Sequence, residues 1–264
     1  MRVLVTNDDG VFAEEMWALV RELKQIAQVV VVAPDREQSA IGTALTLTQP
    51  LRVQAVRPQV PDVETYSVEG TPGDSVILAL EKLVTGRVDL VISGINQGLN
   101  MGNDVLISGT VGAALQGYLR GFPALAVSAS PKNDHYRDDA ARLVASLAAK
   151  VCSSNLPSNI FLNVNLPDLP LARVKGMKVT RLASETHIDT VQEGHDGKRE
   201  YYWLVRKRRD RSHQDTTDIA TVEQGGISVT PLHIYLNSRS GRSSPLITDG
   251  FLAGILKELQ EGER

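Results

Sequence analysis

The chain opens with MRVLVTNDDGVFAEEMWALVRELKQIAQVVVVAP, residues 1–34. Residues 2–6 (RVLVT) and 29–33 (VVVVA) are mainly apolar runs, which is the pattern of strands that are buried on both faces in a parallel sheet. The residues between them, about 13–27, repeat apolar side chains at helical spacing along one face. A strand, a helix and a second strand in this order predict the β-α-β unit that begins a doubly wound sheet.

Strand and helix patterns continue to alternate as far as about residue 165. One helix start is well marked, because Thr71 can serve as N-cap and Pro72 occupies the first helical position. The sequence therefore predicts an α/β fold, a Rossmann-like and mostly parallel sheet flanked by helices. The further predicted strands are residues 45–55 (strands or a hairpin), 66–69, 89–93, 124–128 and 161–164, and the further predicted helices are residues 71–84, 111–120 and 137–152.

The character of the sequence changes after Pro170. Residues 172–235 combine charge with β-type alternation, as in EYYWLVR at 200–206, and glycines supply turns, so we expect protruding hairpins. Residues 247–260 have the pattern of an amphipathic C-terminal helix. We therefore divide the chain into a Rossmann-like catalytic core, 1–170, and a hairpin and C-terminal helix extension, 171–264, that is used for oligomerisation.

Composition excludes several classes of protein. The 264 residues carry a formal net charge of −3, whereas a general nucleic-acid binder is usually basic. Cys152 is the single cysteine, so neither an internal disulfide nor a Cys-rich zinc site is expected. The first residues do not have the pattern of a signal peptide, and no apolar stretch approaches the ~18 residues of a membrane span. We expect a cytoplasmic protein without a membrane partner.

Asp8 and Asp9 directly follow the first predicted strand. Ligands of open α/β sheets bind beyond the carboxyl ends of the strands. Two adjacent carboxylates repel each other, and a hard divalent cation, which prefers oxygen ligands, relieves that repulsion. The alternative is that one Asp caps the following helix while the other is solvated.

Two further oxygen-bearing side chains are placed to join this pair. Asn96 follows the strand 89–93, and its amide oxygen can complete a metal site without adding charge; the alternative is an ordinary turn-forming Asn. Ser39 lies just beyond the second strand, where its hydroxyl could reach the same cleft, although by itself it resembles any loop serine.

Ser108-Gly109-Thr110 begins a predicted helix. The start of a helix offers unpaired N–H groups and a positive dipole end, and Gly109 lets an anion approach the backbone, so these residues predict a phosphate cradle. The alternative is a plain Ser or Thr N-cap. The loop is neither a Walker A motif nor a dinucleotide fingerprint. Together with the metal-type oxygens, it indicates metal-assisted phosphoryl hydrolysis.

At this level of detail the chain resembles a known family. The stretches VLVTNDDG (3–10), PDREQSAIG (34–42), DLVISGINQGLNMGNDVLISGTVGAAL (89–115) and TDIATVEQGGISVTPL (217–232) are similar to SurE, the survival-protein family of 5′/3′-nucleotidases. The likeness extends from residue 1 to about 235, and the N-D-D-G and S-G-I-N-x-G-x-N blocks are specific in combination.

The resemblance implies a metal-dependent phosphatase that hydrolyses nucleoside 5′-monophosphates, and 3′-monophosphates as well, to nucleoside and phosphate; some members also cleave short polyphosphate. It implies one divalent cation per subunit, magnesium or manganese, and a homodimer or homotetramer with exchanged C-terminal segments. The implied metal ligands are Asp8, Asp9, Ser39 and Asn96, the implied phosphate contacts are Asn96, Ser108, Gly109 and Thr110, and the implied catalytic residues are Asp8 and Asp9.

The chain departs from the family pattern at two places. The family usually has Ala-Pro-Gly-type residues after N-D-D-G, where this chain has Val11-Phe12-Ala13-Glu14-Glu15, and an aromatic residue where this chain has Ile227. Neither place holds a ligand position, so the departures concern substrate preference and subunit contacts.

Other residues receive weaker interpretations. Asp9 is the candidate for orienting the attacking water, and none of the five histidines is assigned a catalytic role. The basic run from Arg206 to Arg211 either attracts polyphosphate or nucleic acid or, more simply, is a solvated hairpin or a subunit contact.

Three rival readings stay open. A phosphatase that forms an aspartyl-phosphate usually has D-x-D after the first strand, but the corresponding residues here are Asn7 and Asp9. A receiver-type binding module needs a phosphorylatable Asp at the end of a middle strand, and Ser93–Asn96 contains no carboxylate. A catalytically silent homologue would keep the fold for binding alone, although the intact ligand set argues against it.

Overall fold

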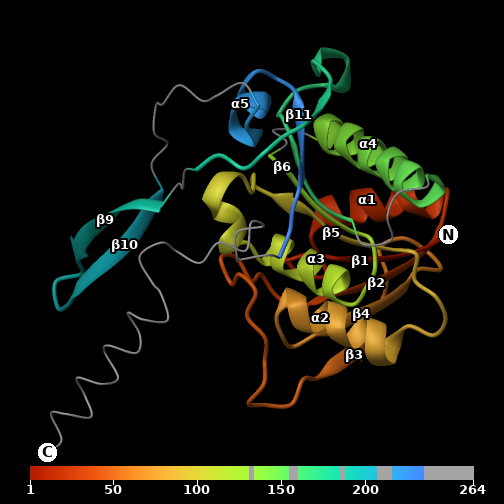
Figure 1. The fold of residues 1–264 in the computed structure, drawn as a ribbon. Helices are drawn as coiled ribbons and strands as arrows, with labels where there is room; N and C mark the ends of the chain where they lie inside the picture. The colour runs from red at the N-terminus through yellow and green to blue at the C-terminus, as the bar shows by residue number, and fades with distance from the viewer. Residues whose placement is uncertain (131–133, 155–159, 185–187, 207–215, 235–264) are drawn as a thin grey trace, which may run out of the picture. The chain divides into compact units, whose positions relative to one another are not determined.

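Nine strands form one sheet in the computed structural model, which describes residues 1–130, 134–154, 160–184, 188–206 and 216–234 (Figure 1). The strand order is β3-β4-β2-β1-β5-β6-β7-β11-β8. At its centre, β1 (Arg2–Thr6) pairs in parallel with β2 (Gln28–Pro34) on one side and with β5 (Leu90–Gln97) on the other. The predicted fold class, a mostly parallel sheet flanked by helices, is confirmed.

The remaining strands extend this parallel centre in both directions. Beyond β2 comes the parallel strand β4, and beyond β5 come the parallel strands β6 and β7. At one edge β3 pairs antiparallel with β4; toward the other edge β11 is antiparallel to β7, and the last strand, β8, is parallel to β11. The bounds of these strands are β3 Val53–Ala55, β4 Glu64–Val68, β6 Ala124–Ala129, β7 Phe161–Leu166, β8 Met177–Val179 and β11 Ile227–Pro231.

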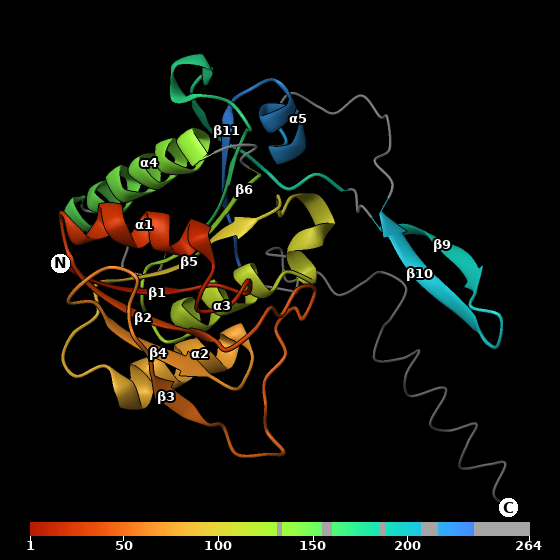
Figure 2. The same ribbon diagram turned by 180° about the vertical axis from the view of Figure 1, so that it is seen from behind.

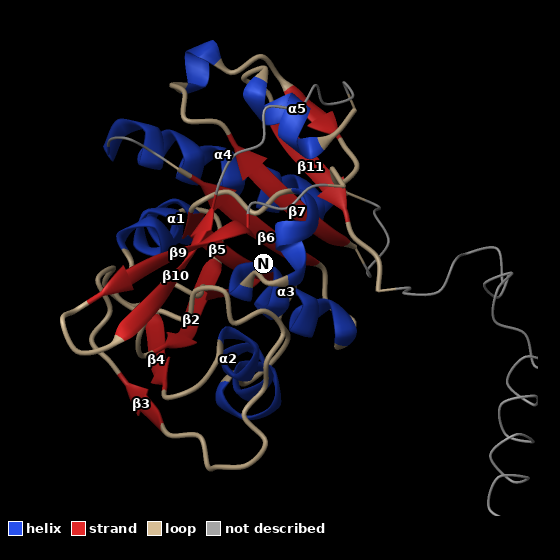
Figure 3. Ribbon diagram, turned by 90° about the vertical axis from the view of Figure 1, so that its left-hand side faces the viewer, coloured by secondary structure: helices blue, strands red, loops and turns tan. Residues whose placement is uncertain are grey.

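Helices cover both faces of the sheet. Figure 2 shows α1 (Glu14–Lys24) beside α4 (Asp134–Ser153) on one face, with α2 (Pro72–Leu78) and α3 (Gly109–Leu119) on the other. The strands, red in Figure 3, therefore lie between two helical layers, shown in blue. The shorter elements are the π-helical turn η1 (Ala79–Leu83), the 3-10 turns η2 (Gly102–Leu106) and η3 (Leu171–Arg173), and α5 (Asp218–Glu223).

The alternation of side chains along the central strands builds two cores. Val3, Val5 and Ile92 belong to the core beneath α1 and α4, whereas Leu4 and Val91 belong to the core beneath α2 and α3. All five are completely buried. Full burial of such a side chain stabilises the fold by about 1.5–3 kcal/mol, so the apolar runs that predicted the strands also hold the layers together.

The predicted start of α2 is confirmed. Thr71 Oγ1 accepts a hydrogen bond from Asp74 N at 3.1 Å, and Asp74 Oδ2 accepts one from Thr71 N at 2.9 Å, which is a capping box. Asp74 Oδ1 also accepts from Thr46 N at 3.0 Å, so this helix start fixes part of the preceding irregular segment.

Two of the predicted strands differ clearly from the observed ones. The strand predicted at 89–93 continues to Gln97, with a register shift between Ser93 and Asn96, so Asn96 lies inside β5. The strands predicted over 45–55 form only as β3, because the alternating residues before it do not pair and Leu47 is 85% exposed. The alternation of apolar residues before β3 therefore does not mark a buried face.

The part of the chain after residue 170 contributes β8 and β11 to the main sheet. In addition, β9 (Ile188–His195) and β10 (Glu200–Arg206) form a separate antiparallel hairpin. Met1–Leu232 forms one compact unit, and the division of function at residue 170 stays a prediction. The predicted helix at 247–260 lies outside the described residues. Within the described residues, no helix is long and apolar enough to cross a membrane.

Candidate active site

The strand order reverses between β1 and β5. From β1 the chain proceeds to β2 and β4 on one side, and from β5 it proceeds to β6 and β7 on the other. A crevice at the carboxyl ends of the two strands at such a switch point is the usual ligand site of an open α/β sheet. Asp8 and Asp9 follow β1, and Asn96 lies near the end of β5, so the sequence placed its candidates at this switch point.

The loop after β1 is tightened by its first residue. Asn7 is fully buried; its Nδ2 donates to Gly10 O at 3.0 Å, and its Oδ1 accepts from Gly10 N at 3.2 Å. Gly10 has φ +102°, a conformation that other residues rarely adopt. An aspartyl-phosphate enzyme would have its nucleophile at position 7, but this chain has the Asn7 carboxamide there, which is not a nucleophile and which bonds Gly10 through both of its polar atoms.

Asp8 is enclosed by the start of α3. Its side chain is 4% exposed, and Oδ1 accepts a hydrogen bond of 2.5 Å from Thr110 Oγ1. Its main-chain oxygen accepts from Gln38 N at 2.7 Å, so the segment after β2 also contacts this residue. A Cβ atom on Gly109 would lie 2.9 Å from Asp8 Oδ2. The missing side chain at position 109 is therefore what lets α3 approach the carboxylate.

Ser108 sets the point at which α3 begins. Its Oγ accepts from Val111 N at 3.1 Å, so it is the N-cap that the sequence offered as the alternative to a phosphate contact. The helix also packs closely further along, since a Cβ on Gly112 would lie 2.3 Å from Gly42 O. The N-terminus of α3 is thus fixed beside Asp8, with Ser108, Gly109 and Thr110 in its first turn.

Asp9 is half-buried and contacts the end of β5. Its Oδ2 accepts from Gln97 N at 3.2 Å, which joins the loop after β1 to the strand that carries Asn96. Asn96 is half-buried too, and its Nδ2 donates to Gly98 O at 2.6 Å. That contact orients the Asn96 amide, and the Asn96 Oδ1 atom has no hydrogen bond to any described residue.

The site carries negative charge that the described residues do not balance. Burial raises the pKa of Asp8, and the hydrogen bonds from Thr110 lower it in part. Burial, and after it the charge of Asp8, raises the pKa of Asp9 to about 6. Glu37 adds to the repulsion at both groups. Among the described residues, no ion pair includes Asp8 or Asp9, so a cation would be strongly favoured here.

Ser39 differs from the other candidates in its orientation. It is exposed, and its Oγ donates to Glu37 Oε1 at 2.7 Å. The segment that carries it does lie at the site, because Gln38 N binds Asp8 O and the Ile41 side chain lies against Gly109. The structure thus brings together Asp8, Asp9 and Asn96 with the start of α3 and places Ser39 on an adjoining segment.

Sequence reasoning missed two contributors to the site: Asn7, which closes the loop after β1, and Glu37, which adds charge. It named Thr110 as a phosphate contact but did not predict that Thr110 bonds Asp8 directly. The N-D-D-G pattern contained the signal for Asn7, since Asn before a turn glycine commonly bonds the local backbone. The contact from Thr110 to Asp8 spans 102 residues, so no local pattern could indicate it.

The donor chemistry of the site fits a hard divalent cation. Within the described part of the chain, no group of three or more His, Cys, Asp or Glu side chains is arranged to hold a metal. A cation here would therefore depend on neutral oxygens as well as on the two carboxylates. Asp8 and Asp9 each use one carboxylate oxygen in a protein hydrogen bond, and Asn96 uses its Nδ2, so each side chain is oriented and keeps one oxygen to offer.

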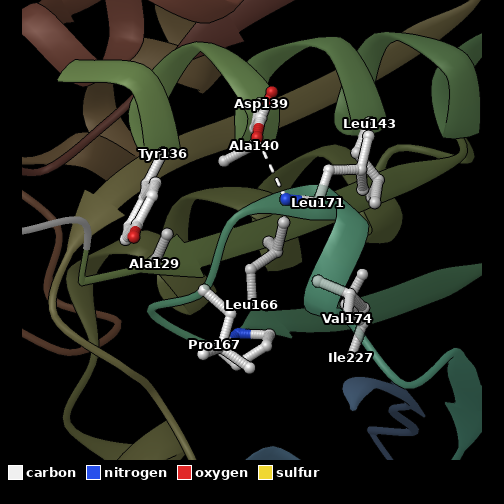
Figure 4. A pocket seen from close by; sticks show the side chains of 11 residues that line it. Ala129, Tyr136, Asp139, Ala140, Leu143, Leu166, Pro167, Leu171, Val174 and Ile227 are labelled. Carbon is white, nitrogen blue, oxygen red and sulfur yellow. Dashed lines mark hydrogen bonds between the residues drawn. The ribbon is translucent and has the colours of Figure 1, made fainter. Parts of the chain in front are cut away.

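A hollow elsewhere in the molecule does not suit this chemistry. It lies between α4 and residues 166–174, and apolar side chains such as Leu143, Leu166 and Val174 form most of its lining (Figure 4). Asp139 Oδ2 accepts there from Leu171 N at 3.0 Å. None of the predicted site residues lines it. A phosphate needs a cation or several N–H donors, so we place the site at the ends of β1 and β5.

The histidines and the basic run are assigned no role in the site. His195 accepts a hydrogen bond from Gly197 N in the turn of the hairpin, and His233 is exposed. The side chains of His135, His187 and His213 lie outside the described residues, as do those of the basic run from Arg206 to Arg211.

Comparison with known proteins gives one consistent result. The model of the family described as "Survival protein SurE" matches residues 3–189. A protein of Dehalococcoides mccartyi named 5′-nucleotidase SurE is 52% identical over 259 residues, which cover 97% of this chain and 96% of that protein. The protein of the same name from Legionella pneumophila is 43% identical over 235 residues, 89% of this chain and 91% of that protein.

A solved structure agrees with these relatives. The crystal structure of the SurE protein from Aquifex aeolicus is similar, with a TM-score of 0.77 and 34% sequence identity. The likeness covers 98% of this chain and 100% of that one, so it extends beyond the parallel core.

Proposed function

The chain belongs to the SurE survival-protein family, and from that premise we propose that it is a divalent-metal-dependent phosphatase that hydrolyses nucleoside 5′-monophosphates to nucleoside and phosphate. The chain is a phosphoric monoester hydrolase, because proteins named 5′-nucleotidase SurE are similar to it over nearly its full length. The metal dependence and the roles of individual residues are our proposal. The observation that carries it is the unbalanced pair Asp8 and Asp9 beside the start of α3.

The proposed metal ligands are Asp8, Asp9, Ser39 and Asn96. Asp8 and Asp9 supply charge, and Asn96 supplies the amide oxygen that its bond to Gly98 leaves over. Ser39 would have to give up its hydrogen bond to Glu37 in order to join them. Magnesium or manganese suits this oxygen set, and one such ion per subunit would neutralise the repulsion between the two carboxylates.

The proposed phosphate contacts are Asn96, Ser108, Gly109 and Thr110. The first N–H groups of a helix have no acceptor within the helix, and the helix dipole favours an anion at that end. Gly109 has no side chain to keep a phosphoryl oxygen away from the backbone. The start of α3 therefore supports binding of the phosphate next to the carboxylate pair.

In the mechanism that we propose, the protein positions the phosphate group and a water molecule, and that water attacks the phosphate. When bound, the metal would polarise a phosphate oxygen and lower the pKa of an associated water. Asp9 orients the attacking water through the carboxylate oxygen that Gln97 does not use. The N–H groups at the start of α3 stabilise the charge that develops on the phosphoryl oxygens. Thr110 holds Asp8 in place throughout by its hydrogen bond to Oδ1.

We extend the proposal to related substrates and to the assembly of the enzyme. Nucleoside 3′-monophosphates and short polyphosphate present the same phosphoryl group and are the further substrates to examine, with the cytoplasm as the expected compartment. We also propose a homodimer or homotetramer with exchanged C-terminal segments. Trp203 and Leu204 of β10 are 66% and 74% exposed, and an isolated two-stranded hairpin is marginally stable, so a second copy is its expected partner.

The deciding experiment measures phosphate release from a panel of 5′- and 3′-nucleoside monophosphates. The protein is stripped with a chelator and then supplied with magnesium or manganese. Asp8→Asn is compared with Asp89→Asn, which alters a carboxylate at the opposite end of β5 that bonds Arg2 N at 2.9 Å. We expect metal-dependent release that falls at least about a hundredfold in Asp8→Asn, beyond the usual loss for a supporting residue, and stays near wild type in Asp89→Asn.

The other results are equally informative. Turnover that survives both chelation and Asp8→Asn would exclude the metal mechanism and leave a different phosphatase to explain. No turnover with any nucleotide or metal would favour a catalytically silent member of the family.

A further inference from the structure

The segment from Gln97 to Ser108, called here the site loop, separates two proposed functional elements. Asn96 immediately precedes it, and the first turn of α3 immediately follows it. Its conformation therefore determines where a proposed metal ligand and the proposed phosphate cradle lie relative to each other. Apart from Gln97, the last residue of β5, the site loop contains no regular element except the short turn η2, so contacts with other parts of the chain must hold it in place.

Asn100 provides the first anchor. Its backbone N–H donates to Asn165 Oδ1 at 2.8 Å, and its Nδ2 donates to Ser128 Oγ at 2.9 Å. Its backbone oxygen accepts from Asn163 Nδ2 at 2.8 Å and from Asn165 Nδ2 at 3.0 Å. Asn163, Asn165 and Ser128 are fully buried on β6 and β7. This anchor ties the site loop to the sheet within the parallel core.

Asp218 provides the second anchor, from a distant part of the chain. Its side chain is fully buried at the start of α5, and Oδ2 accepts from Gly102 N at 2.8 Å. The other oxygen, Oδ1, accepts from Ala183 N at 2.9 Å and from Ile219 N at 2.8 Å. One carboxylate therefore joins the site loop, the start of α5 and the segment around Ala183, which leads toward the hairpin β9–β10.

Apolar packing supports the same junction. Met101 of the site loop belongs to a small buried cluster with Ala183, Ile219 and Val222, and Leu99 packs against it. This cluster is separate from the two cores that hold the helices on the sheet. The polar contact and the apolar contact thus join the same segments, which makes the junction a specific docking of α5 against the site loop.

We propose that Asp218 is a positioning residue for catalysis: by holding Gly102, it fixes the site loop so that Asn96 and the first turn of α3 keep the spacing that phosphate hydrolysis requires. This inference rests on the proposed function. Asp218 contacts none of the proposed metal or phosphate residues, so it acts through the loop. Its contacts all go to backbone N–H groups, so the carboxylate is suited to this task by its two acceptor oxygens.

The substitution Asp218→Asn tests the contact with Gly102 separately from the contacts with Ala183 and Ile219. An amide has one acceptor oxygen and one NH₂ group of nearly the same shape as the carboxylate. The favoured orientation keeps the oxygen on Ala183 N and Ile219 N, since the opposite orientation would place the NH₂ against two donors. The NH₂ then faces Gly102 N, another donor. Asp218→Asn should therefore release the site loop while α5 stays attached to Ala183.

The control is Thr230→Val. Thr180 Oγ1 and Thr230 Oγ1 form a buried hydrogen bond of 2.7 Å that touches neither the site loop nor α5. Each variant thus removes one buried hydrogen bond. For both variants and the wild type, we would measure hydrogen–deuterium exchange over residues 97–108, the manganese dissociation constant by calorimetry, and kcat and KM with a nucleoside 5′-monophosphate and manganese.

We expect Asp218→Asn to exchange faster over the site loop, to bind manganese about tenfold more weakly and to lose about tenfold to a hundredfold in kcat/KM. Thr230→Val should show a similar loss of melting temperature without these changes. Equal behaviour of the two variants would overturn the inference. A wild-type protein without any phosphatase activity would instead overturn the proposed function. The exchange data would still test separately whether Asp218 holds the site loop.

A measurement on the wild type covers the case in which Asp218→Asn does not fold. Gly102 N–H is buried and bonded to Asp218, whereas its neighbour Asn103 is exposed. Residue-resolved exchange should therefore show strong protection at Gly102. Exchange at Gly102 as fast as at a freely exposed amide would overturn the inference without any variant.

Discussion

The site loop and the hairpin β9–β10 are both extensions of the sheet core, but they are held in opposite ways. The site loop is tied to buried side chains of β6, β7 and α5 through Asn100 and Asp218. The hairpin strands bond each other, and their apolar side chains stay exposed, with Val191 at 53% and Leu204 at 74%.

This difference shows which contacts stabilise each segment. Buried polar groups need partners, and those of the site loop find them within the same chain, so the loop is complete in one subunit. Apolar side chains exposed on both faces of a hairpin gain stability only when another surface covers them. We therefore expect the catalytic geometry to belong to the single chain and the hairpin to belong to an assembly.

Gly109→Ala tests whether the catalytic geometry depends on packing within the single chain, and it should have the largest effect of the variants compared. The new Cβ would lie 2.9 Å from Asp8 Cβ and Oδ2 and 3.0 Å from Ile41 Cγ2, so either Asp8 or α3 must move. A displacement of about 1 Å at a reacting site can cost about a hundredfold in rate, and we expect that loss in kcat/KM. Alanine is the better helix former by about 1 kcal/mol, which should limit the loss of stability.

Leu119→Ala is the matched control, because Leu119 lies on the same helix and is 50% exposed. It should leave kcat/KM unchanged. Steady-state kinetics that find Gly109→Ala within twofold of wild type would show that the close approach of α3 to Asp8 is not needed for activity.

A milder change at the same contact is Thr110→Val. It removes the hydroxyl that bonds Asp8 Oδ1 and nearly preserves side-chain shape. Loss of a residue that orients a metal ligand typically weakens metal binding by about tenfold to a hundredfold, which calorimetry with manganese would measure. Thr110→Ser keeps the hydroxyl and should restore most of the affinity. Equal affinities in Thr110→Val and wild type would contradict the supporting role.

The smallest expected effect tests the hairpin. Trp203→Ser should leave the melting temperature of the isolated chain nearly unchanged, because the side chain is 66% exposed. In an assembly that buries it, loss of such an aromatic residue costs about 2 kcal/mol, or about 30-fold in the dimer dissociation constant. Sedimentation equilibrium would measure this constant. Lys198→Ser, in the turn of the hairpin, is the control, and equal self-association in all three proteins would refute the interface.

Much of the core could be predicted from local patterns. The apolar runs at 2–6 and 29–33 became β1 and β2, and Thr71 and Asp74 formed the capping box that their spacing favours. The position of Asp8 and Asp9 at the switch point followed from the same strands. These features depend on residues close together in the sequence, where periodicity and capping chemistry are informative.

The remainder depended on contacts between distant segments. Leu45 and Leu47 alternate as in a strand, but no neighbouring strand pairs with them. The strand that carries Asn96 extends past Ser93 because β6 continues to pair with it after the register shift. Asp218 meets Gly102 across 116 residues, and nothing near Asp218 in the sequence indicates that partner. Such pairings arise from the fold as a whole.

The bond between Asp218 and Gly102 also has a consequence for the protein during its synthesis. Gly102 leaves the ribosome 116 residues before Asp218, a delay on the order of ten seconds at ordinary rates of translation. Throughout that interval the nascent chain holds both aspartates and the start of α3 but lacks the residue that fixes the loop between them. A nascent chain would therefore gain its full activity only near the end of translation.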